Sequence, residues 1–374
     1  MNFIDVIFFQ AEIAPEKLAV VAQGAVLSYG RLAHGIVSAQ RRLTASGLTE
    51  GQTVAVNVAH PIDHFVFLCA LYRLKIASAS VTGQVESYFD NVKFDAVLSD
   101  SVNALFSAKQ PAARLILVEP SWFRDQVTFS VAERTRAVRD PNPGWLCRVT
   151  CLADGSPNPT VVRTTARALE AQLASYCLAV LPNWERMISA LALNTLTGFL
   201  FGITALWLGR TICLAEPMIA RNVIAAYKHH YLVAAAADAG QLAALQASQF
   251  IAMPSLRGAH LVGQRFSPEA IARWLETISS NTVLSYVHPA IGIVAYGLAA
   301  RFKDVAGAVG YVAPWVEVQV VNADGVAMPA DREGDLRFRD RGDQTGRPAD
   351  QHDAPWIYPG QRARLTRNRL LAVF

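Results

Sequence analysis

The sequence has no run of apolar residues long enough to cross a membrane. A membrane-spanning helix needs about 18 apolar residues in a row, and the most apolar stretch, residues 188–214, is interrupted by Asn194, Gly198, Gly202 and Arg210. The N-terminus also lacks the basic start and the small-residue cleavage site of a secretory signal. These two absences predict a cytoplasmic protein with no membrane span.

Paired cysteines and clustered basic charge are missing as well. Among the five cysteines only Cys147 and Cys151 stand close together, and no second Cys or His pair completes a zinc site. We therefore expect free thiols and no metal centre. The formal net charge is only +4 and the arginines are scattered, so the sequence has no basic stripe of the kind that binds nucleic acid. Lysine is scarce, which leaves few candidates for binding phosphate.

What the chain does have is a regular alternation of strand and helix patterns. Apolar residues at helical spacing predict a helix over residues 29–46 and another over 62–74, with a buried strand between them. Alternation of this kind is typical of parallel sheets covered by helices. After residue 307 the pattern changes to short β runs, and Asp324-Gly325 is typical of a hairpin turn.

These patterns predict an α/β fold with more than one part. At 374 residues the chain is too long for a single compact core. We expect two doubly wound α/β subdomains, residues 1–145 and 146–306. A small β-barrel-like subdomain is expected to follow over residues 307–374.

The stretch from Thr150 to Leu169, TCLADGSPNPTVVRTTARAL, has the punctuation of a phosphate-binding loop. It is a run of small residues with a proline, and a helix is predicted from Arg163 to Leu173. Small residues let backbone amides approach phosphate oxygens closely. No lysine stands in this stretch, however, and Asp154 brings a negative charge that repels phosphate.

Three further stretches are punctuated by glycine, and two of them by proline as well. They are LALNTLTGFLFG from Leu191, YVHPAIGIVAYG from Tyr286, and WIYPGQRARL from Trp356. With the loop and the order of elements, they resemble the large N-terminal part of the adenylate-forming (AMP-binding) superfamily, which includes acyl-CoA synthetases, adenylation domains and luciferases. The resemblance covers essentially all 374 residues. It implies that superfamily's fold, and it implies ATP and magnesium as cofactors for joining a carboxylate to the α-phosphate of ATP.

The resemblance also places the family's catalytic groups on positions where this chain has other residues. The phosphate lysine falls on Asn158 or Thr160, depending on the register, and the magnesium-binding glutamate falls on Ala290. The aspartate that holds both ribose hydroxyls falls on Gln361. The family's mobile C-terminal domain, which supplies a further lysine, is expected to be absent, because the chain stops near the family's hinge.

The candidate site positions fall into four groups. They are the degenerate phosphate loop (Thr150, Asp154, Gly155, Ser156, Asn158 and Thr160), the nucleotide and magnesium motif (Tyr286, His288, Ala290 and Gly292), the ribose position (Gln361) and the acyl-pocket gate (Thr195 and Gly198). His288 is the one weak candidate for a catalytic residue, although a lone histidine beside a proline is more often structural. No residue is predicted to bind a metal.

Three hypotheses follow for the function. In the first, the chain is a catalytically degenerate domain that docks an acyl carrier protein, holds an acyl or aryl group, or pairs with an active partner subunit, with no cofactor. In the second, it is an enzyme of altered chemistry that uses His288, Asp154 or Arg163. In the third, it is an adenylating ligase completed by another chain, with ATP and magnesium. Losing one electrostatic donor typically costs about 2.7–4 kcal/mol of transition-state stabilisation, so several coincident losses favour the first hypothesis.

Overall fold

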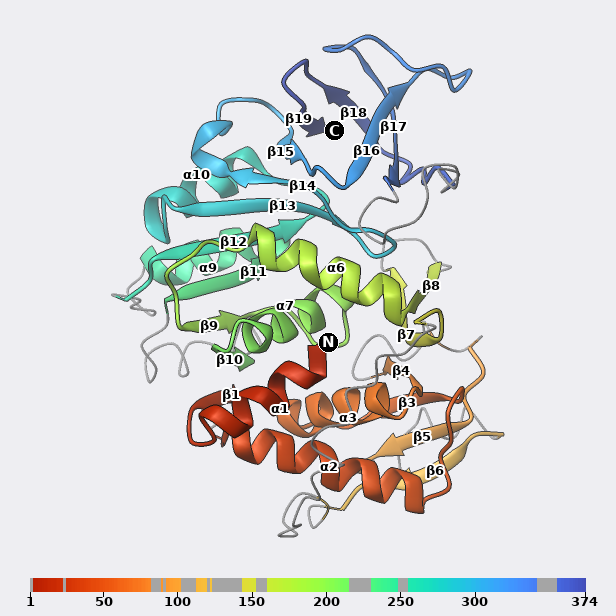
Figure 1. Ribbon diagram of the computed structural model, residues 1–374. Helices are drawn as coiled ribbons and strands as arrows, with labels where there is room; N and C mark the ends of the chain where they lie inside the picture. The colour runs from red at the N-terminus through yellow and green to blue at the C-terminus, as the bar shows by residue number, and fades with distance from the viewer. Residues whose placement is uncertain are drawn as a thin grey trace. The chain divides into compact units, whose positions relative to one another are not determined.

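The computed structural model describes residues 3–22, 25–81, 89, 92–101, 112–119, 122, 143–152, 160–214, 230–247, 255–341 and 355–374. These residues form a mixed α/β structure, which confirms the predicted fold class (Figure 1). The chain divides into two compact units. The N-terminal unit comprises Met1–Glu170 and Ala192–Ala215, and the C-terminal unit comprises Ala171–Leu191 and Glu216–Phe374. This division into two units does not test the three-part division expected from the sequence, which remains a prediction.

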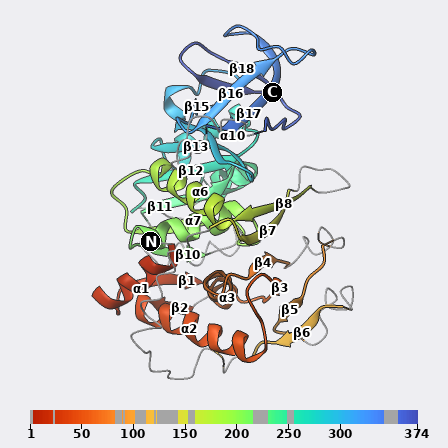
Figure 2. The same ribbon diagram turned by 45° about the vertical axis from the view of Figure 1, so that its right-hand side comes forward.

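The N-terminal unit contains a six-stranded sheet with the strand order β6-β5-β3-β4-β7-β8. Its strands are β3 (Thr53–Asn57), β4 (Ala77–Ser80), β5 (Ala96–Ser99), β6 (Arg114–Leu117), β7 (Leu146–Leu152) and β8 (Thr160–Thr165). The first five in this order are parallel, and β8 pairs antiparallel with β7. The pair β7–β8 can be followed as two adjacent strands in both ribbon views (Figure 2).

Two helices of the N-terminal unit lie where the sequence predicts. Helix α2 spans Tyr29–Ala45 and α3 spans Pro61–Arg73, each within one residue of the expected range. Ser28 caps α2, because its hydroxyl accepts a hydrogen bond from the amide of Arg31 at 3.3 Å. The unit also contains α1 (Phe3–Ile13), β1 (Leu18–Ala22), β2 (Ala25–Ser28), α7 (Leu196–Trp207) and β10 (Thr211–Leu214). Strand β1 lies between β10, to which it is parallel, and β2, to which it is antiparallel.

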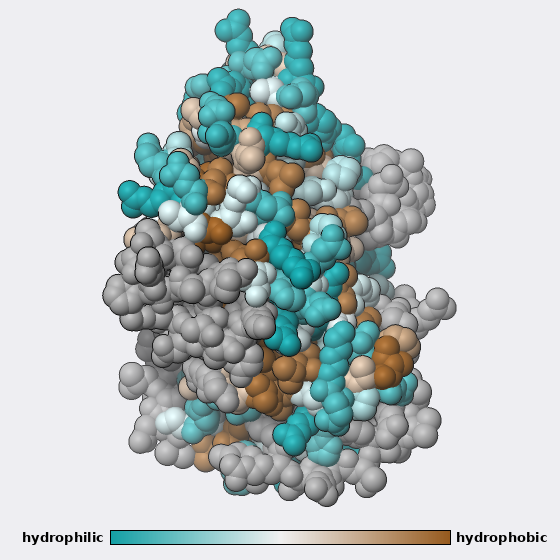
Figure 3. Space-filling model, turned by 90° about the vertical axis from the view of Figure 1, so that its left-hand side faces the viewer, coloured by the Kyte–Doolittle hydropathy of each residue, from teal (hydrophilic) through white to brown (hydrophobic). Residues whose placement is uncertain are grey.

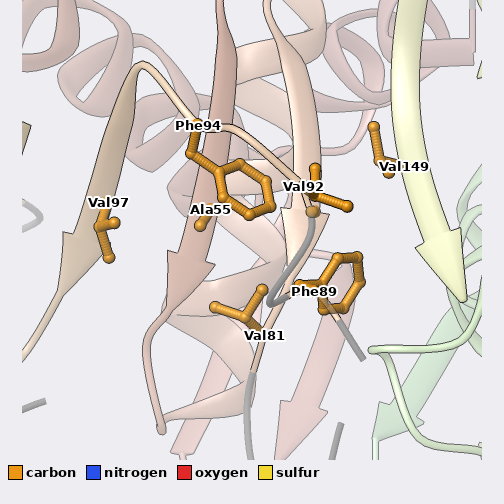
Figure 4. Close-up of a cluster of buried hydrophobic side chains, with 8 residues drawn as sticks. Ala55, Val81, Phe89, Val92, Phe94, Val97 and Val149 are labelled. Atoms are coloured by element: carbon orange, nitrogen blue, oxygen red, sulfur yellow. The ribbon is translucent and has the colours of Figure 1, made fainter. Parts of the chain in front are cut away.

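The two faces of the six-stranded sheet differ in character. On one face Val149 of β7 lies with Ala55, Val97, Phe89 and Phe94 in a cluster of buried apolar side chains (Figure 4). Successive side chains of a strand point to opposite faces. The neighbours of Val149 on either side along β7 therefore point to the other face, where α3 packs.

One predicted boundary is wrong. The helix expected from Arg163 begins three residues later, because Thr160–Thr165 is strand β8 and α6 spans Ala166–Ala179. The residues before Ala166 are rich in β-branched valine and threonine, which favour strands. Six of their positions pair with β7, and this ladder outweighs the helical pattern that follows.

The C-terminal unit is built on a sheet that is parallel at one end and antiparallel at the other. Its strand order is β9-β11-β12-β13-β14-β15-β19-β18-β17-β16. Strands β9 (Arg186–Ser189), β11 (Tyr231–Ala235), β12 (Gly258–Gly263) and β13 (Thr282–His288) are parallel. Strand β14 (Gly292–Leu298) follows β13 as an antiparallel neighbour. The β-rich region expected after residue 307 contains β15 (Ala308–Val312), β16 (Val316–Val321), β17 (Glu333–Asp340), β18 (Arg362–Leu365) and β19 (Leu370–Val373). Two helices of this unit are α9 (Ala239–Ala247) and α10 (Pro268–Thr277).

The surface, the helices and the cysteines can be compared with the predictions about membrane spans and thiols. Hydrophilic and hydrophobic residues are interspersed over the face drawn in Figure 3, without one continuous apolar area among the residues coloured there. In the described part of the chain no helix is long and apolar enough to cross a membrane. All five cysteines are free thiols, as expected from their spacing.

Candidate functional site

The nucleotide motif predicted from the sequence lies on the hairpin formed by β13 and β14. Tyr286 and His288 end β13, Ala290 lies in the turn, and Gly292 begins β14 opposite His288. Gly292 has φ +85°, a left-handed conformation that favours glycine. The four predicted residues are therefore brought together by one tight connection.

Tyr286 joins this hairpin to the predicted ribose position. Its ring is fully buried, and its hydroxyl donates a hydrogen bond to Oε1 of Gln361 at 2.6 Å. Gln361 is itself buried, with 8% of its surface exposed, and lies directly before β18. Burial raises the pKa of Tyr286 above its ordinary value, so the phenol stays protonated and remains the donor. The sequence predicted both positions, but it did not predict that they contact each other.

His288 is held in a neutral state. Its ring lies edge-on against Phe338 of β17, with the ring centroids 5.1 Å apart. Its Nδ1 accepts a hydrogen bond from the amide of Ala290 at 3.3 Å, which leaves Nε2 as the protonated nitrogen. Burial lowers the pKa of His288 to about 4. At neutral pH the residue is therefore an uncharged donor whose one lone pair is occupied, which is a poor general base.

Gln172 of α6 holds the turn of the same hairpin in place. Its Nε2 donates to the carbonyl of Pro289 at 3.0 Å, and its side chain lies where a Cβ on Gly292 would be, with Cγ at 3.0 Å. Gln172 is buried, and its Oε1 has no hydrogen-bond partner among the described residues. The sequence does not single out this residue, because nothing local relates a helical glutamine to a turn more than a hundred residues later.

The side chains of this group carry no net charge. Tyr286 and Gln361 are neutral, His288 is neutral at pH 7, Ala290 presents a methyl group, and Gln172 an amide. Magnesium prefers carboxylate and other oxygen ligands, and nucleotide phosphates need cations or backbone amides. Among the described residues no group of three or more His, Cys, Asp or Glu side chains is arranged to hold a metal ion.

The predicted phosphate loop joins β7 to β8 in the N-terminal unit. Thr150 lies on β7 and is buried, and Thr160 begins β8 and is exposed. The other predicted loop residues, Asp154, Gly155, Ser156 and Asn158, lie outside the described residues. The loop therefore connects two antiparallel strands, and the helix that was expected to follow it at once is separated from it by β8.

The predicted acyl-gate residues form the start of α7. Thr195 is its N-cap: the hydroxyl accepts from the amide of Gly198 at 3.0 Å and donates to the carbonyl of Ala192 at 2.8 Å. A Cβ on Gly198 would lie 2.1 Å from that same carbonyl oxygen, so only glycine fits. Both residues thus have a structural role, and their part in an acyl pocket stays a prediction.

The N-terminal unit contains a buried cation that was not among the residues predicted from the sequence. Arg148 of β7 is 1% exposed, and its NH2 donates to Oγ of Ser80 and to the carbonyl of Leu193, each at 2.9 Å. Its guanidinium also lies over the ring of Phe199, 4.6 Å from the centroid. One arginine inside the otherwise apolar and small run LCRVTCL was the signal that could have been read.

His64 of α3 extends this polar group. Its Nε2 lies 2.8 Å from Oγ of Ser80, and its Nδ1 lies 3.1 Å from the carbonyl of Val58. A carbonyl can only accept, so Nδ1 carries the proton and Nε2 accepts from the Ser80 hydroxyl. Burial, and then the charge of Arg148, lower the pKa of His64 to about 4. The order of donors from Arg148 through Ser80 to neutral His64 is thereby fixed.

Comparison of the sequence with protein-family models and with curated proteins finds no match. Comparison of the structure with solved structures finds strong similarity over the whole chain. Amide bond synthetase McbA from Marinactinospora thermotolerans is 18% identical, with a TM-score of 0.81 and a match covering 100% of this chain and 79% of that one. The N-terminal domain of FACL13 from Mycobacterium tuberculosis is 14% identical, with a TM-score of 0.81 and a match covering 100% of both chains.

A third similar structure is the luciferase-like enzyme of the mealworm Zophobas morio. It is 14% identical, with a TM-score of 0.80, and the match covers 100% of this chain and 95% of that one. At these identities the likeness concerns the fold.

Proposed function

We propose that this chain, which has the fold of the N-terminal domain of adenylate-forming (AMP-binding) enzymes, is catalytically degenerate. On this proposal the chain does not join a carboxylate to ATP by itself, and it uses neither ATP nor magnesium as a cofactor. It acts as a non-catalytic binding or partner subunit in acyl or carrier-protein metabolism. Its ligand is then an acyl or aryl group, an acyl carrier protein or an active partner subunit.

The hydrogen bond between Tyr286 and Gln361 is the observation that carries this proposal. Gln361 stands where the resemblance places an aspartate that accepts from two ribose hydroxyls. Gln361 has one acceptor atom where an aspartate has two, and Tyr286 already donates to it at 2.6 Å, which occupies one of its two lone pairs. A buried neutral pair replaces a charged two-oxygen acceptor, so the grip on a ribose is weakened.

The surroundings of this pair support the same conclusion. His288 is neutral, and its acceptor nitrogen is occupied by the amide of Ala290. Ala290 stands where the resemblance places the magnesium-binding glutamate, and a methyl group cannot bind a hard cation. Enzymes usually gain most of their rate by stabilising the charge that develops in the transition state. This hairpin has no charged side chain among Tyr286, His288, Ala290 and Gly292 with which to do so.

An assay of ATP–pyrophosphate exchange tests the proposal. The isolated chain is assayed with magnesium across a panel of fatty and aromatic acids, beside an active adenylating enzyme as the positive control. We expect exchange at the background rate with every acid. Exchange well above background with any acid would refute catalytic degeneracy.

A second candidate is a divergent adenylating ligase whose missing groups come from another chain. The β13–β14 hairpin favours it, since the tyrosine and the glycine that the resemblance expects stand at positions 286 and 292, the tyrosine buried and the glycine in a left-handed conformation. The same exchange assay separates the two candidates when it is run on the complex purified from the native host. Activity that appears only in that complex, and needs ATP and magnesium, would support the ligase.

A further inference from the structure

One face of the β7–β8 hairpin collects buried polar side chains. Thr164 of β8 faces Arg148 directly across the ladder, and Thr150 lies two residues further along β7, so the three side chains share that face. Arg148 is 1% exposed, and each threonine is 3% exposed. Ser78 and Ser80 of β4 border the same face, next to Arg148 in the parallel ladder.

These side chains have unused hydrogen-bonding groups. Nε of Arg148, Oγ1 of Thr150 and Oγ1 of Thr164 have no hydrogen-bond partner within the described ranges of the chain. Buried polar atoms in proteins are nearly always partnered, because an unmade hydrogen bond costs the full desolvation of the group. Three such atoms on one face of one hairpin therefore indicate a partner that lies outside the described residues.

The charge at this face determines what kind of partner fits. The described partners of Arg148 are neutral: the hydroxyls of Ser78 and Ser80, the carbonyl of Leu193 and the ring of Phe199. Burial lowers the pKa of Arg148 to about 10, so the guanidinium is still protonated at neutral pH. A buried cation needs an anion more than it needs a further dipole.

We propose that the face formed by Arg148, Thr150 and Thr164 binds an oxyanion, namely the carboxylate or phosphate group of a small ligand. The Nε–H of Arg148 and the two threonine hydroxyls supply three donors, and a charged acceptor makes shorter and stronger hydrogen bonds with them than water does. His64 is neutral and adds no second positive charge, so a single negative charge is matched. This inference goes beyond the proposed function and does not rest on it, because a chain without exchange activity can still bind an anion.

The test is the dependence of stability on the added anion. The midpoint of thermal unfolding is measured with rising sodium phosphate, with rising octanoate below its micelle concentration, and with sodium chloride at matched ionic strength. Because unfolding exposes this buried face, the anion can reach it as the chain unfolds and refolds. The unfolding equilibrium therefore reports binding even if the folded chain has no fast route by which the anion enters. A ligand that binds only the folded chain raises stability with the logarithm of its concentration.

Variants assign the effect to this face. Replacing both threonines with isosteric valine (Thr150→Val with Thr164→Val) removes two donors without changing shape, and Arg148→Met removes the charge. Each is expected to weaken the apparent affinity for the anion at least tenfold. Arg167→Met, a half-buried arginine just beyond β8, is the matched control and should leave the affinity unchanged. The valine variant keeps the proposal testable if Arg148→Met does not fold.

The outcomes are distinct. Stabilisation by phosphate alone identifies a phosphate ligand, and stabilisation by octanoate alone identifies a carboxylate; either supports the proposal when the valine variant abolishes it. If neither anion stabilises the chain more than chloride does, the proposal is wrong. Stabilisation that survives unchanged in the valine variant also overturns it, because the anion then binds elsewhere.

Discussion

The hydroxyl of Tyr286 donates to Oε1 of Gln361 at 2.6 Å, and both side chains are buried in the C-terminal unit. The two residues are 75 positions apart, so the contact fastens the start of β18 to the end of β13. A glutamine in this position therefore has a structural partner. The residue that stands at the predicted ribose position thus stabilises the fold through its hydrogen bond to Tyr286.

The coupling between these two residues should be measurable. Gln361→Leu leaves the Tyr286 hydroxyl buried without a partner, and Tyr286→Phe leaves the amide oxygen without its donor; each is expected to cost about 1–3 kcal/mol of unfolding free energy. The double variant should cost less than the sum, with a coupling of about 0.5–3 kcal/mol. Urea unfolding of the four proteins measures this cycle. Strict additivity would mean that the hydrogen bond contributes nothing in solution.

Gly292 and Gly325 form a matched pair for backbone and packing effects. Both have positive φ, +85° and +75°, but a Cβ on Gly292 would meet Gln172 at 3.0 Å, whereas nothing lies within 4 Å of one on Gly325. Gly325→Ala should cost about 1 kcal/mol for the left-handed backbone alone. Gly292→Ala should cost more, because the Gln172 side chain must also move, and this movement strains its hydrogen bond to the carbonyl of Pro289. Equal costs in chemical denaturation would argue against the clamp by Gln172.

The start of α7 offers a graded test of its geometry. Gly198→Ala places a methyl group against the carbonyl oxygen of Ala192 and should be severely destabilising, by about 3 kcal/mol or more. Thr195→Ala removes only the cap and should cost about 1 kcal/mol. Thermal unfolding checks both. A mild effect of Gly198→Ala would show that the segment before α7 shifts freely, contrary to the close contact described.

Acid should destabilise the fold through its buried histidines. Burial lowers the pKa of His64 to about 4 and that of His260 to about 3, whereas an unfolded histidine titrates near 6.5. As the pH falls below about 6.5 the unfolded chain takes up protons that the folded chain does not. Stability should therefore fall by about 1.4 kcal/mol per pH unit for each histidine, and this contribution is fully present only above about pH 6.5.

The variant His64→Gln checks the source of this slope. A glutamine can still accept from Ser80 but does not titrate. Urea unfolding between pH 4.5 and 7.5 should show a shallower loss of stability in the variant than in the parent chain. An identical slope in both proteins would place the acid sensitivity outside His64.

The sequence predicted most elements because their signals are local. Helix α2 was expected at residues 29–46 and spans Tyr29–Ala45, since a serine cap and one apolar face define it. The start of α6 was misplaced because the ladder between β7 and β8 decides it, and pairing between strands is not a local property.

The site was predicted as positions and not as contacts. Tyr286 and Gln361 were singled out from separate stretches, and only the fold brings their side chains together. The apolar run around Arg148 hinted at its burial, but its partners come from β4 and from Leu193, which are 45 or more positions away, so these contacts could not be derived from neighbours in the sequence. Asp154, Gly155, Ser156 and Asn158 lie outside the described residues, and their role in a phosphate loop stays a prediction.

The most direct test of catalytic degeneracy is a calorimetric titration of the isolated chain with ATP in the presence of magnesium. Losing the carboxylates at positions 290 and 361 should abolish metal-dependent nucleotide binding, so we predict no heat of binding up to millimolar ATP, with or without the metal. The same titration of the double variant Ala290→Glu with Gln361→Asp serves as the comparison, and any gain of metal-dependent heat there would be due to the restored carboxylates. Saturable, magnesium-dependent binding of ATP by the unaltered chain at micromolar concentration would contradict the account.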